Sequence, residues 1–279
     1  MDSETILKIL QNRLKLQRYA NNTIKSYCSY TQVFLEQMEK YNRLDEIPIS
    51  EIELFINRKV IQENISASYQ RSLVGAIKKV FELVENQKIE LNYLYPKRKV
   101  NKLPTFFSQE EVRNLLNATE NLKHKAILTT IYSCGLRLSE LINLKITDIK
   151  SESDLLLIRQ SKGNKDRIVA LPDKLLELLR EYYKVYQPKD FLFEGTKGNQ
   201  YSERSVQLIL KNAMSKAGVL SKGSVHTLRH SYATHLIKSG IDVRVVQELL
   251  GHNDIRTTMI YTHITDIDKK STPSPLDFL

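Results

Sequence analysis

Histidine is concentrated in one stretch of this chain, and a histidine cluster can bind a metal ion or an anion. Five of the six histidines lie between residues 226 and 263. His226 and His230 are four residues apart, a spacing that places two imidazoles on one helical face, as in zinc proteases. Those proteases need a glutamate directly after the first histidine, whereas this chain has Thr227 there, and Arg229 would put a positive charge beside the ion. The spacing therefore does not favour a metal site.

Arginine, histidine and tyrosine in this part of the sequence favour anion chemistry instead. Arg137 follows Gly135, which is expected to end a helix, and Arg229 stands at the start of another expected helix. Leu-Leu-Gly precedes His252, and Tyr261 follows nine residues later. Arginine can contact two phosphate oxygens at once, and histidine can add a hydrogen bond or move a proton. Each fragment alone is weak, because the chain has 14 tyrosines and single arginines usually lie on the surface.

The order and spacing of the fragments are specific. Gly-Leu-Arg-x-Ser-Glu begins at Gly135, Lys162 follows in an expected hairpin, His-x-x-Arg-His begins at His226, and Leu-Leu-Gly-His ends at His252, ahead of Tyr261. This combination, over nearly the whole chain, resembles the tyrosine recombinase (integrase) family and is most similar to its compact Xer-type members. We expect no additional arm-binding domain at the N-terminus. The distance between the hairpin lysine and the first histidine is also too short for the insertion typical of integron integrases.

The resemblance implies a role for each of these residues. Tyr261 would be the nucleophile that attacks the scissile DNA phosphate, giving a 3′-phosphotyrosyl bond and a free 5′-hydroxyl. A phenol with a pKa of about 10 needs activation, which cationic surroundings supply. Arg137 and Arg229 would hold the non-bridging oxygens and stabilise the charge that develops in the pentavalent transition state.

Three further residues would complete the catalytic set by the same resemblance. His252 would donate another hydrogen bond to the phosphate. His226 would act as a base toward the tyrosine hydroxyl or as a further phosphate donor. Lys162 would protonate the leaving 5′-oxygen, although Lys165, three residues on, could reach the same groove. The resemblance implies no metal and no other cofactor, and no ATP, because the phosphotyrosine conserves the bond energy.

Other chemically active residues near these motifs are expected to have structural roles. Glu140, one helical turn after Arg137, is expected to orient a catalytic residue, and His230 is expected to form a hydrogen bond within the domain. Cys134 is expected to be a buried, inert thiol at a helix end. Only Cys28 accompanies it, so a disulfide scaffold is excluded and a reducing cytoplasm fits best.

The sequence predicts a helical N-terminal domain over residues 1–95. Helical periodicity covers about 5–19, 22–38 and 67–86, and Ser50 with Glu53 forms a capping-box pattern at the start of another helix. By resemblance this bundle is a SAM-like core-binding domain. Residues 96–104 contain two prolines, four cations and no anion, which indicates a basic linker.

Residues 105–279 are predicted to form the catalytic domain. Ser108 and Glu111 form a capping box, and helices are expected at about 173–187, 202–217, 227–239 and 242–250. Residues 155–158 and 167–170 are expected to be the strands of a hairpin that turns at Gly163–Asn164. The predicted fold class is mainly α with a small β-hairpin or sheet, a mixed α+β catalytic domain, and a C-terminal tail at 264–279.

Composition narrows the functional class. The 279 residues carry 42 Lys and Arg against 32 Asp and Glu, a net charge of +10, which favours a polyanionic partner such as nucleic acid. The apolar fraction of 41% is too high for a disordered chain. No apolar run reaches the ~18 residues of a membrane span, and no secretory signal is visible. We therefore expect a cytoplasmic, nucleoid-associated protein.

The resemblance also implies partners, and alternatives remain. Four protomers would assemble on two double-stranded DNA sites and exchange strands through a Holliday junction, with or without a second recombinase or an accessory protein. The tail could dock on a neighbouring protomer. The alternatives are a type IB topoisomerase, which relaxes DNA as a monomer, and an accessory factor that binds DNA without cleaving it. The full set of arginine, lysine, histidine and tyrosine argues against the accessory factor, which needs no nucleophile.

Overall fold

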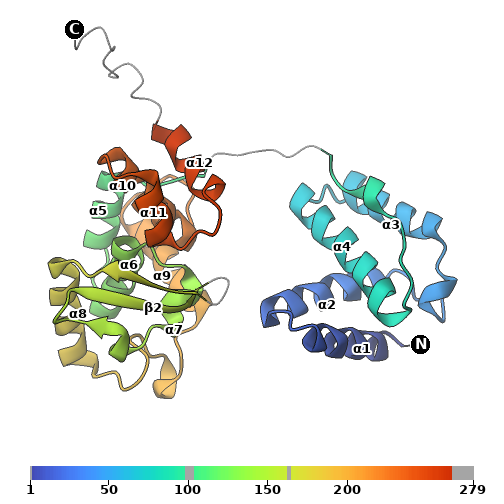
Figure 1. Cartoon of the computed structure of the whole chain (residues 1–279), viewed down its shortest axis with the longest axis horizontal. Helices are drawn as coiled ribbons and strands as arrows, with labels where there is room; N and C mark the ends of the chain where they lie inside the picture. Colours follow the sequence, from blue (N-terminus) through green and yellow to red (C-terminus); the bar gives the residue numbers. More distant parts are fainter. Residues whose placement is uncertain (1, 98–103, 162–164, 266–279) are drawn as a thin grey trace, which may run out of the picture. The chain divides into compact units, whose positions relative to one another are not determined.

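A computed structural model describes residues 2–97, 104–161 and 165–265 (Figure 1). The chain divides into two compact units, Met1–Asn101 and Lys102–Leu279, and this division falls inside the proline-containing basic segment 96–104. Each unit has its own hydrophobic core. In the described part of the chain, no helix combines the length and the apolar character needed to cross a bilayer.

The first unit is a helical bundle. It contains α1 (Ser3–Leu16), α2 (Asn21–Leu35), α3 (Ile49–Ile61) and α4 (Ala67–Val84), with 3-10 turns η1 (Leu44–Glu46) and η2 (Asn92–Leu94). Helix α4 contacts the other three helices, and Phe34, Phe55 and Phe81 meet in the core. The Ser50–Glu53 capping box was a wrong prediction. Helix α3 begins directly after Pro48, whose ring fixes φ at −64° and so starts the helix earlier.

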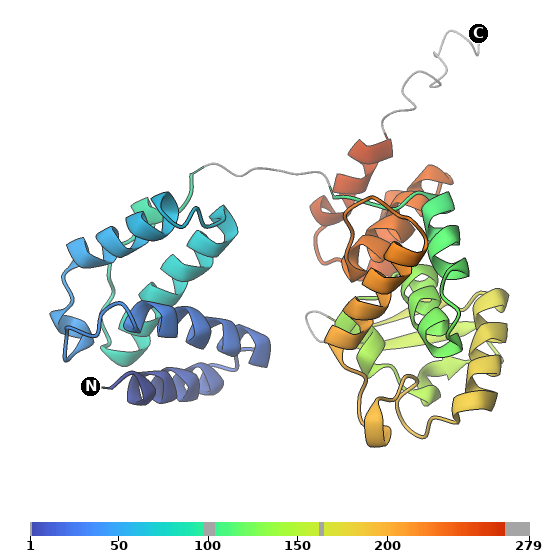
Figure 2. The same ribbon diagram turned by 180° about the vertical axis from the view of Figure 1, so that it is seen from behind.

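The second unit combines helices with one small sheet, as predicted. Its helices are α5 (Gln109–Asn117), α6 (Leu122–Cys134), α7 (Leu138–Asn143), α8 (Asp173–Tyr186), α9 (Glu203–Lys216), α10 (Val225–Lys238), α11 (Val243–Leu250) and α12 (Arg256–Thr265), with 3-10 turns η3 (Ile146–Asp148) and η4 (Thr196–Gly198). The Ser108–Glu111 capping box is present at α5. Helix α10 contacts α5, α6, α9, α11 and α12. Figure 2 shows α10 to α12, in orange and red, at one end of this unit and α8, in yellow, at the other.

The sheet is antiparallel, in the order β1-β2-β3. Strands β2 (Leu155–Ser161) and β3 (Lys165–Ala170) form the predicted hairpin, and the two-residue β1 (Ile149–Lys150) adds to β2. The register shifts between Ile158 and Ser161, and the expected turn at 163–164 lies outside the described residues. Strand β3 also contacts α11, which connects the hairpin to the C-terminal helices. Helix α12 extends to Thr265, so residues 264–265 of the expected tail are helical, and 266–279 lie outside the described residues.

Candidate active site

The turn that ends α6 places Arg137 at the start of α7. Gly135 adopts a left-handed φ of +58°, and a Cβ there would lie 2.5 Å from the Tyr232 ring, so this turn requires glycine. Arg137 directly precedes α7. Its backbone N–H donates to Glu140 Oε2 at 2.8 Å, and its Nη1 donates to Glu140 Oε1 at 2.6 Å. One carboxylate therefore fixes both the backbone and the side chain of Arg137.

Glu140 is a buried carboxylate surrounded by arginines. Its side chain is 3% exposed, and besides Arg137 it accepts from Nη1 and Nη2 of Arg167 at 2.7 and 2.8 Å. Nη1 of Arg229 lies 3.6 Å from Oε2. Burial alone would raise the pKa of Glu140, but the hydrogen bonds and charge of Arg167 outweigh it and lower the pKa to about 2. Glu140 is therefore ionised at every physiological pH.

Arg229 is the most deeply buried of these arginines. It projects from α10, and its Nη1 donates to the carbonyl of Gly135 and its Nη2 to the carbonyl of Leu250, both at 2.6 Å. Burial, reinforced by the charge of Arg137, lowers the pKa of Arg229 to about 9, so the guanidinium keeps its proton at neutral pH. The turn that positions Arg137 thus also anchors Arg229.

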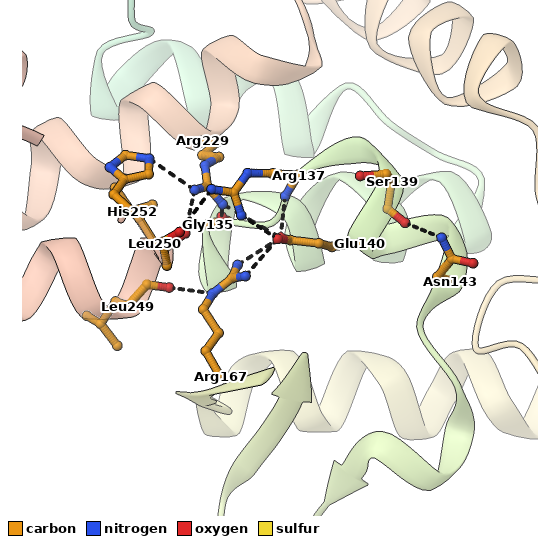
Figure 3. Close-up of polar contacts among 11 residues, drawn as sticks. Gly135, Arg137, Ser139, Glu140, Asn143, Arg167, Arg229, Leu249, Leu250 and His252 are labelled. Atoms are coloured by element: carbon orange, nitrogen blue, oxygen red, sulfur yellow. Dashed lines mark hydrogen bonds and ion pairs between the residues drawn. The ribbon is translucent and has the colours of Figure 1, made fainter. Parts of the chain in front are cut away.

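Besides Glu140, the three arginines share a second set of hydrogen-bond acceptors, the backbone carbonyls at the C-terminal end of α11 (Figure 3). Three consecutive carbonyls each accept one guanidinium hydrogen bond: Leu249 from Arg167 at 2.8 Å, Leu250 from Arg229 at 2.6 Å, and Gly251 from Arg137 at 3.2 Å. The last carbonyls of a helix have no partner within the helix and carry its negative dipole end. Cationic side chains are therefore suited to this position.

His252 follows Gly251, the residue that caps the C-terminal end of α11. Its Nε2 lies 3.2 Å from Nη2 of Arg229, and its Nδ1 lies 2.9 Å from Oγ1 of Thr258. Arginine has no acceptor, so Nε2 accepts and Nδ1 carries the proton. Burial, reinforced by the charge of Arg229, lowers the pKa of His252 to about 4. The imidazole is therefore neutral and lies directly on the arginine cluster.

Tyr261 lies on α12 against α10. Tyr261 is only 1% exposed, and its hydroxyl oxygen is 2.8 Å from Nδ1 of His230. Burial raises the pKa of Tyr261, while the charges of Arg229 and Arg137 oppose that shift. Burial also lowers the pKa of His230 to about 4, so a neutral imidazole holds the phenol. The expected hydrogen bond of His230 within the domain is therefore made to Tyr261.

The structure brings most of the predicted set together. Arg137, Arg229 and His252 contact one another or share a partner, and the charges of both arginines reach Tyr261. His226 is exposed at the start of α10, and partial burial of its ring, together with the charge of Arg229, lowers its pKa. Its expected contact with the tyrosine hydroxyl is not seen, because His230 occupies that place. Lys162 lies outside the described residues, as does the side chain of its alternative, Lys165.

Arg167 is the residue of this cluster that the sequence did not single out. It lies on β3, two residues before the buried Val169, whereas the intervening Ile168 is 57% exposed. Side chains alternate along a strand, so Arg167 shares the inward face with Val169. An arginine on the buried face of a strand requires a carboxylate partner, and this alternation is the signal that could have revealed it.

Cys134 lies at the end of α6, before the turn that positions Arg137. Cys134 is completely buried at the end of α6, and burial raises the pKa of its thiol to about 12, as expected for an inert cysteine. Within the described ranges, no group of three His, Cys, Asp or Glu side chains is placed to bind a metal ion. The chemistry of the cluster is that of a cationic pocket for an anion.

Comparisons with known proteins agree with this geometry. Residues 105–267 match the phage integrase family, and residues 6–91 match the N-terminal SAM-like domain of phage integrases. A tyrosine recombinase of Thermosipho africanus is 33% identical over 268 residues, covering 91% of this chain and 93% of that protein.

Solved structures show the same architecture. The XerH site-specific recombinase, bound to its palindromic difH substrate in a post-cleavage complex, matches with a TM-score of 0.75 and 26% identity over 97% of this chain and 84% of that one. A lambda integrase tetramer bound to a Holliday junction matches with a TM-score of 0.74 and 19% identity, over 92% of this chain and 76% of that one. At 19% identity, the similarity to lambda integrase shows a shared fold and nothing further.

Proposed function

This chain belongs to the phage integrase family of tyrosine recombinases, and from that membership we propose that Tyr261 cleaves DNA at a phosphate held between Arg137 and Arg229. The protein is a site-specific recombinase. The observation that carries the proposal is the pairing of both arginines with Glu140 and with the end of α11. Two guanidinium groups fixed side by side can bind the two non-bridging oxygens of one phosphate.

The reaction is a transesterification. The Tyr261 oxygen bonds to phosphorus as the bond from phosphorus to the 5′-oxygen breaks, which leaves a 3′-phosphotyrosyl bond and a 5′-hydroxyl. The phenol loses its proton, and the leaving oxygen gains one, for which Lys162 is the proposed donor by family resemblance. Attack of a 5′-hydroxyl from another strand reverses the chemistry and joins new partners.

Charge balance in the site favours the transition state over bound substrate. Three guanidinium groups and one carboxylate leave the cluster with a net charge of +2. A phosphodiester carries one negative charge, and its pentavalent transition state approaches two. The cluster therefore complements the charge that develops during reaction, which is what accelerates it. His252 adds a hydrogen bond to the same phosphate once the anion draws a proton onto Nε2.

Tyr261 must change partners to react. Its buried hydroxyl is held by His230, so α12 has to shift before the oxygen can reach a phosphate. At that point the charges of Arg137 and Arg229, which already act on the phenol, favour its ionised form. His226, exposed at the start of α10, serves as a phosphate donor or accepts the phenolic proton in that state.

Both units are proposed to act on the same DNA. Residues 1–95 form the core-binding domain, 96–104 the linker and 105–279 the catalytic domain. Strand exchange cuts and rejoins the four strands of two duplexes, so four protomers each supply one tyrosine, and the intermediate is a Holliday junction. A DNA substrate supports the proposal that the protein is cytoplasmic and nucleoid-associated.

A single substitution tests the nucleophile. Tyr261→Phe removes one oxygen from a packed ring, so the protein should still retard its DNA site in a gel but form no covalent adduct on a nicked suicide substrate. Tyr232→Phe, on the neighbouring helix α10, is the matched control and should form adduct as the wild type does. Adduct from the Tyr261 variant would disprove the assignment.

A further inference from the structure

All three nitrogens of the Arg167 guanidinium group donate hydrogen bonds within the arginine cluster, which consists of Arg137, Arg167 and Arg229. Nη1 and Nη2 form a two-pronged contact with Glu140 at 2.7 and 2.8 Å, and Nε donates to the carbonyl of Leu249 at 2.8 Å. Its side chain is 7% exposed. Because all three nitrogens donate to groups within the domain, this arginine is directed toward its neighbours and not toward a ligand.

These contacts join three elements of the second unit. Arg167 belongs to β3, Glu140 to α7, and Leu249 to the last turn of α11. Arg137 and Arg229 rest on the same two supports, the Glu140 carboxylate and the carbonyls that follow Leu249. A shift of either support would therefore move both arginines.

On the premise that Arg137 and Arg229 hold the scissile phosphate, we propose that Arg167 is a positioning residue of the recombination reaction. It fixes Glu140 relative to the end of α11, and this fixed distance aligns the two phosphate-binding guanidinium groups. Without the two-pronged contact, the Glu140 carboxylate can turn and carry its other partners, Arg137 and Arg229, away from the phosphate. A misplacement of the order of 1 Å in such a site costs about 100-fold in rate.

Arg167→Lys separates alignment from charge. Lysine keeps the positive charge but cannot contact both Glu140 and Leu249 in the planar geometry of arginine. We expect the maximal rate of adduct formation on the suicide substrate to fall about 100-fold, and the half-saturating protein concentration to change by less than about threefold.

The matched control is Arg159→Lys on the adjacent strand. Arg159 also pairs with a buried carboxylate, because its Nε donates to Asp148 Oδ1 at 2.6 Å, and Asp148 is 2% exposed. It contacts neither Glu140 nor α11 in the described structure. Arg159→Lys should cleave within about threefold of the wild type. An Arg167→Lys variant that cleaves as fast as this control would overturn the proposal.

A neutral substrate distinguishes positioning from general damage to the fold. In a methylphosphonate, a methyl group replaces one non-bridging oxygen and removes the negative charge, so the alignment of two guanidinium groups matters less. The rate ratio of wild type to Arg167→Lys should therefore shrink at least tenfold when the scissile phosphate becomes a methylphosphonate. An unchanged ratio would contradict a positioning role. Should the lysine variant unfold at the assay temperature, Arg167→Gln is read by the same ratio.

Two controls in the same experiment test the proposed function separately from the role of Arg167. Wild-type protein must form adduct at Tyr261, and Arg137→Ala must lower the rate on the natural phosphate. Failure of either result disproves the proposed function itself. If both hold and the Arg167 variants cleave normally, the role of Arg167 alone is wrong.

Discussion

At the scale of single residues, one carboxylate organises the site. Glu140 is buried among Arg137, Arg167 and Arg229, and the first two form direct hydrogen bonds with it. Three guanidinium groups would repel one another in a buried pocket without a compensating negative charge. Glu140 therefore both positions the arginines and permits them to lie close together.

Replacing this carboxylate by an amide should be costly. Glu140→Gln keeps the shape but leaves buried positive charges without compensation, so the free energy of unfolding should fall by about 3 kcal/mol. Urea unfolding measures that loss, and adduct formation should slow as well. Asp148→Asn is the control: its partner Arg159 is 53% exposed and can be hydrated, so a smaller loss and normal cleavage are expected. Equal losses in the two variants would contradict the special role of Glu140.

Two buried histidines should make stability depend on pH. Burial lowers the pKa of His230 and His252 from 6.5 to about 4, so the folded protein resists their protonation. As pH falls from about 6.5 to about 4, the unfolded chain gains protons first and stability decreases; above about 6.5 this loss is absent. The melting temperature should therefore be lower at pH 5 than at pH 7.

Glutamine at both histidines isolates their contribution. His230→Gln with His252→Gln should make the melting temperature less sensitive to pH between 5 and 7, since glutamine does not titrate. The exposed His226, changed to glutamine alone, should have less effect. A double variant with the same pH dependence as the wild type would show that other groups cause it.

Residue types and spacing predicted much of the site, and its limits are physical. Arg137, Arg229 and His252 were identified, and the structure gathers them. The spacing could not tell which imidazole holds Tyr261, because His226 and His230 lie on one face of α10, and packing of α12 selects His230. Arg167 was missed because its partner, Glu140, lies 27 residues away in the sequence.

At the scale of elements, the turn between α6 and α7 positions both Arg137 and Arg229. Gly135 ends α6, its carbonyl accepts from Arg229, and Arg137 follows two residues later. Gly135→Ala would impose a left-handed conformation on alanine and place a Cβ 2.5 Å from the Tyr232 ring. We expect a loss of about 3 kcal/mol in unfolding free energy and slower cleavage.

Gly218 offers a matched comparison for this turn. It also has a left-handed φ, +64°, after α9, but a Cβ there would meet nothing within 4 Å. Gly218→Ala should therefore cost only the backbone strain, about 1 kcal/mol, and leave cleavage unchanged. Denaturant unfolding and adduct assays on both variants make the comparison, and similar behaviour of the pair would refute the account of Gly135.

Elements were predictable where periodicity was strong. Three helices of the first unit (α1, α2 and α4) and the strands of the β2–β3 hairpin follow from apolar spacing. Strand β1 has only two residues, too few for any alternation to be seen, and it exists because β2 offers it an edge. The start of α3 depended on Pro48 fixing the backbone, which outweighed the polar capping pattern that follows it.

At the scale of the whole molecule, the net charge of +10 suits a DNA substrate. Neutralising phosphates with lysine and arginine releases counterions, so affinity should fall steeply with salt. We expect the binding constant for the recombination site to decrease at least about 10³-fold from about 50 mM to about 200 mM salt, measured by fluorescence anisotropy. Tyr261→Phe should show the same slope, because this substitution changes no charge on the protein. A salt-independent constant would contradict a phosphate-based interface.

The most direct test of the central claim is to locate the covalent bond. Wild-type protein is trapped on a nicked suicide substrate, the adduct is digested with a protease, and the peptide attached to DNA is sequenced by mass spectrometry. The account predicts one linkage, from the oxygen of Tyr261 to a 3′-phosphate, with a free 5′-hydroxyl on the released strand. A linkage at another residue, or to a 5′-phosphate, would contradict it.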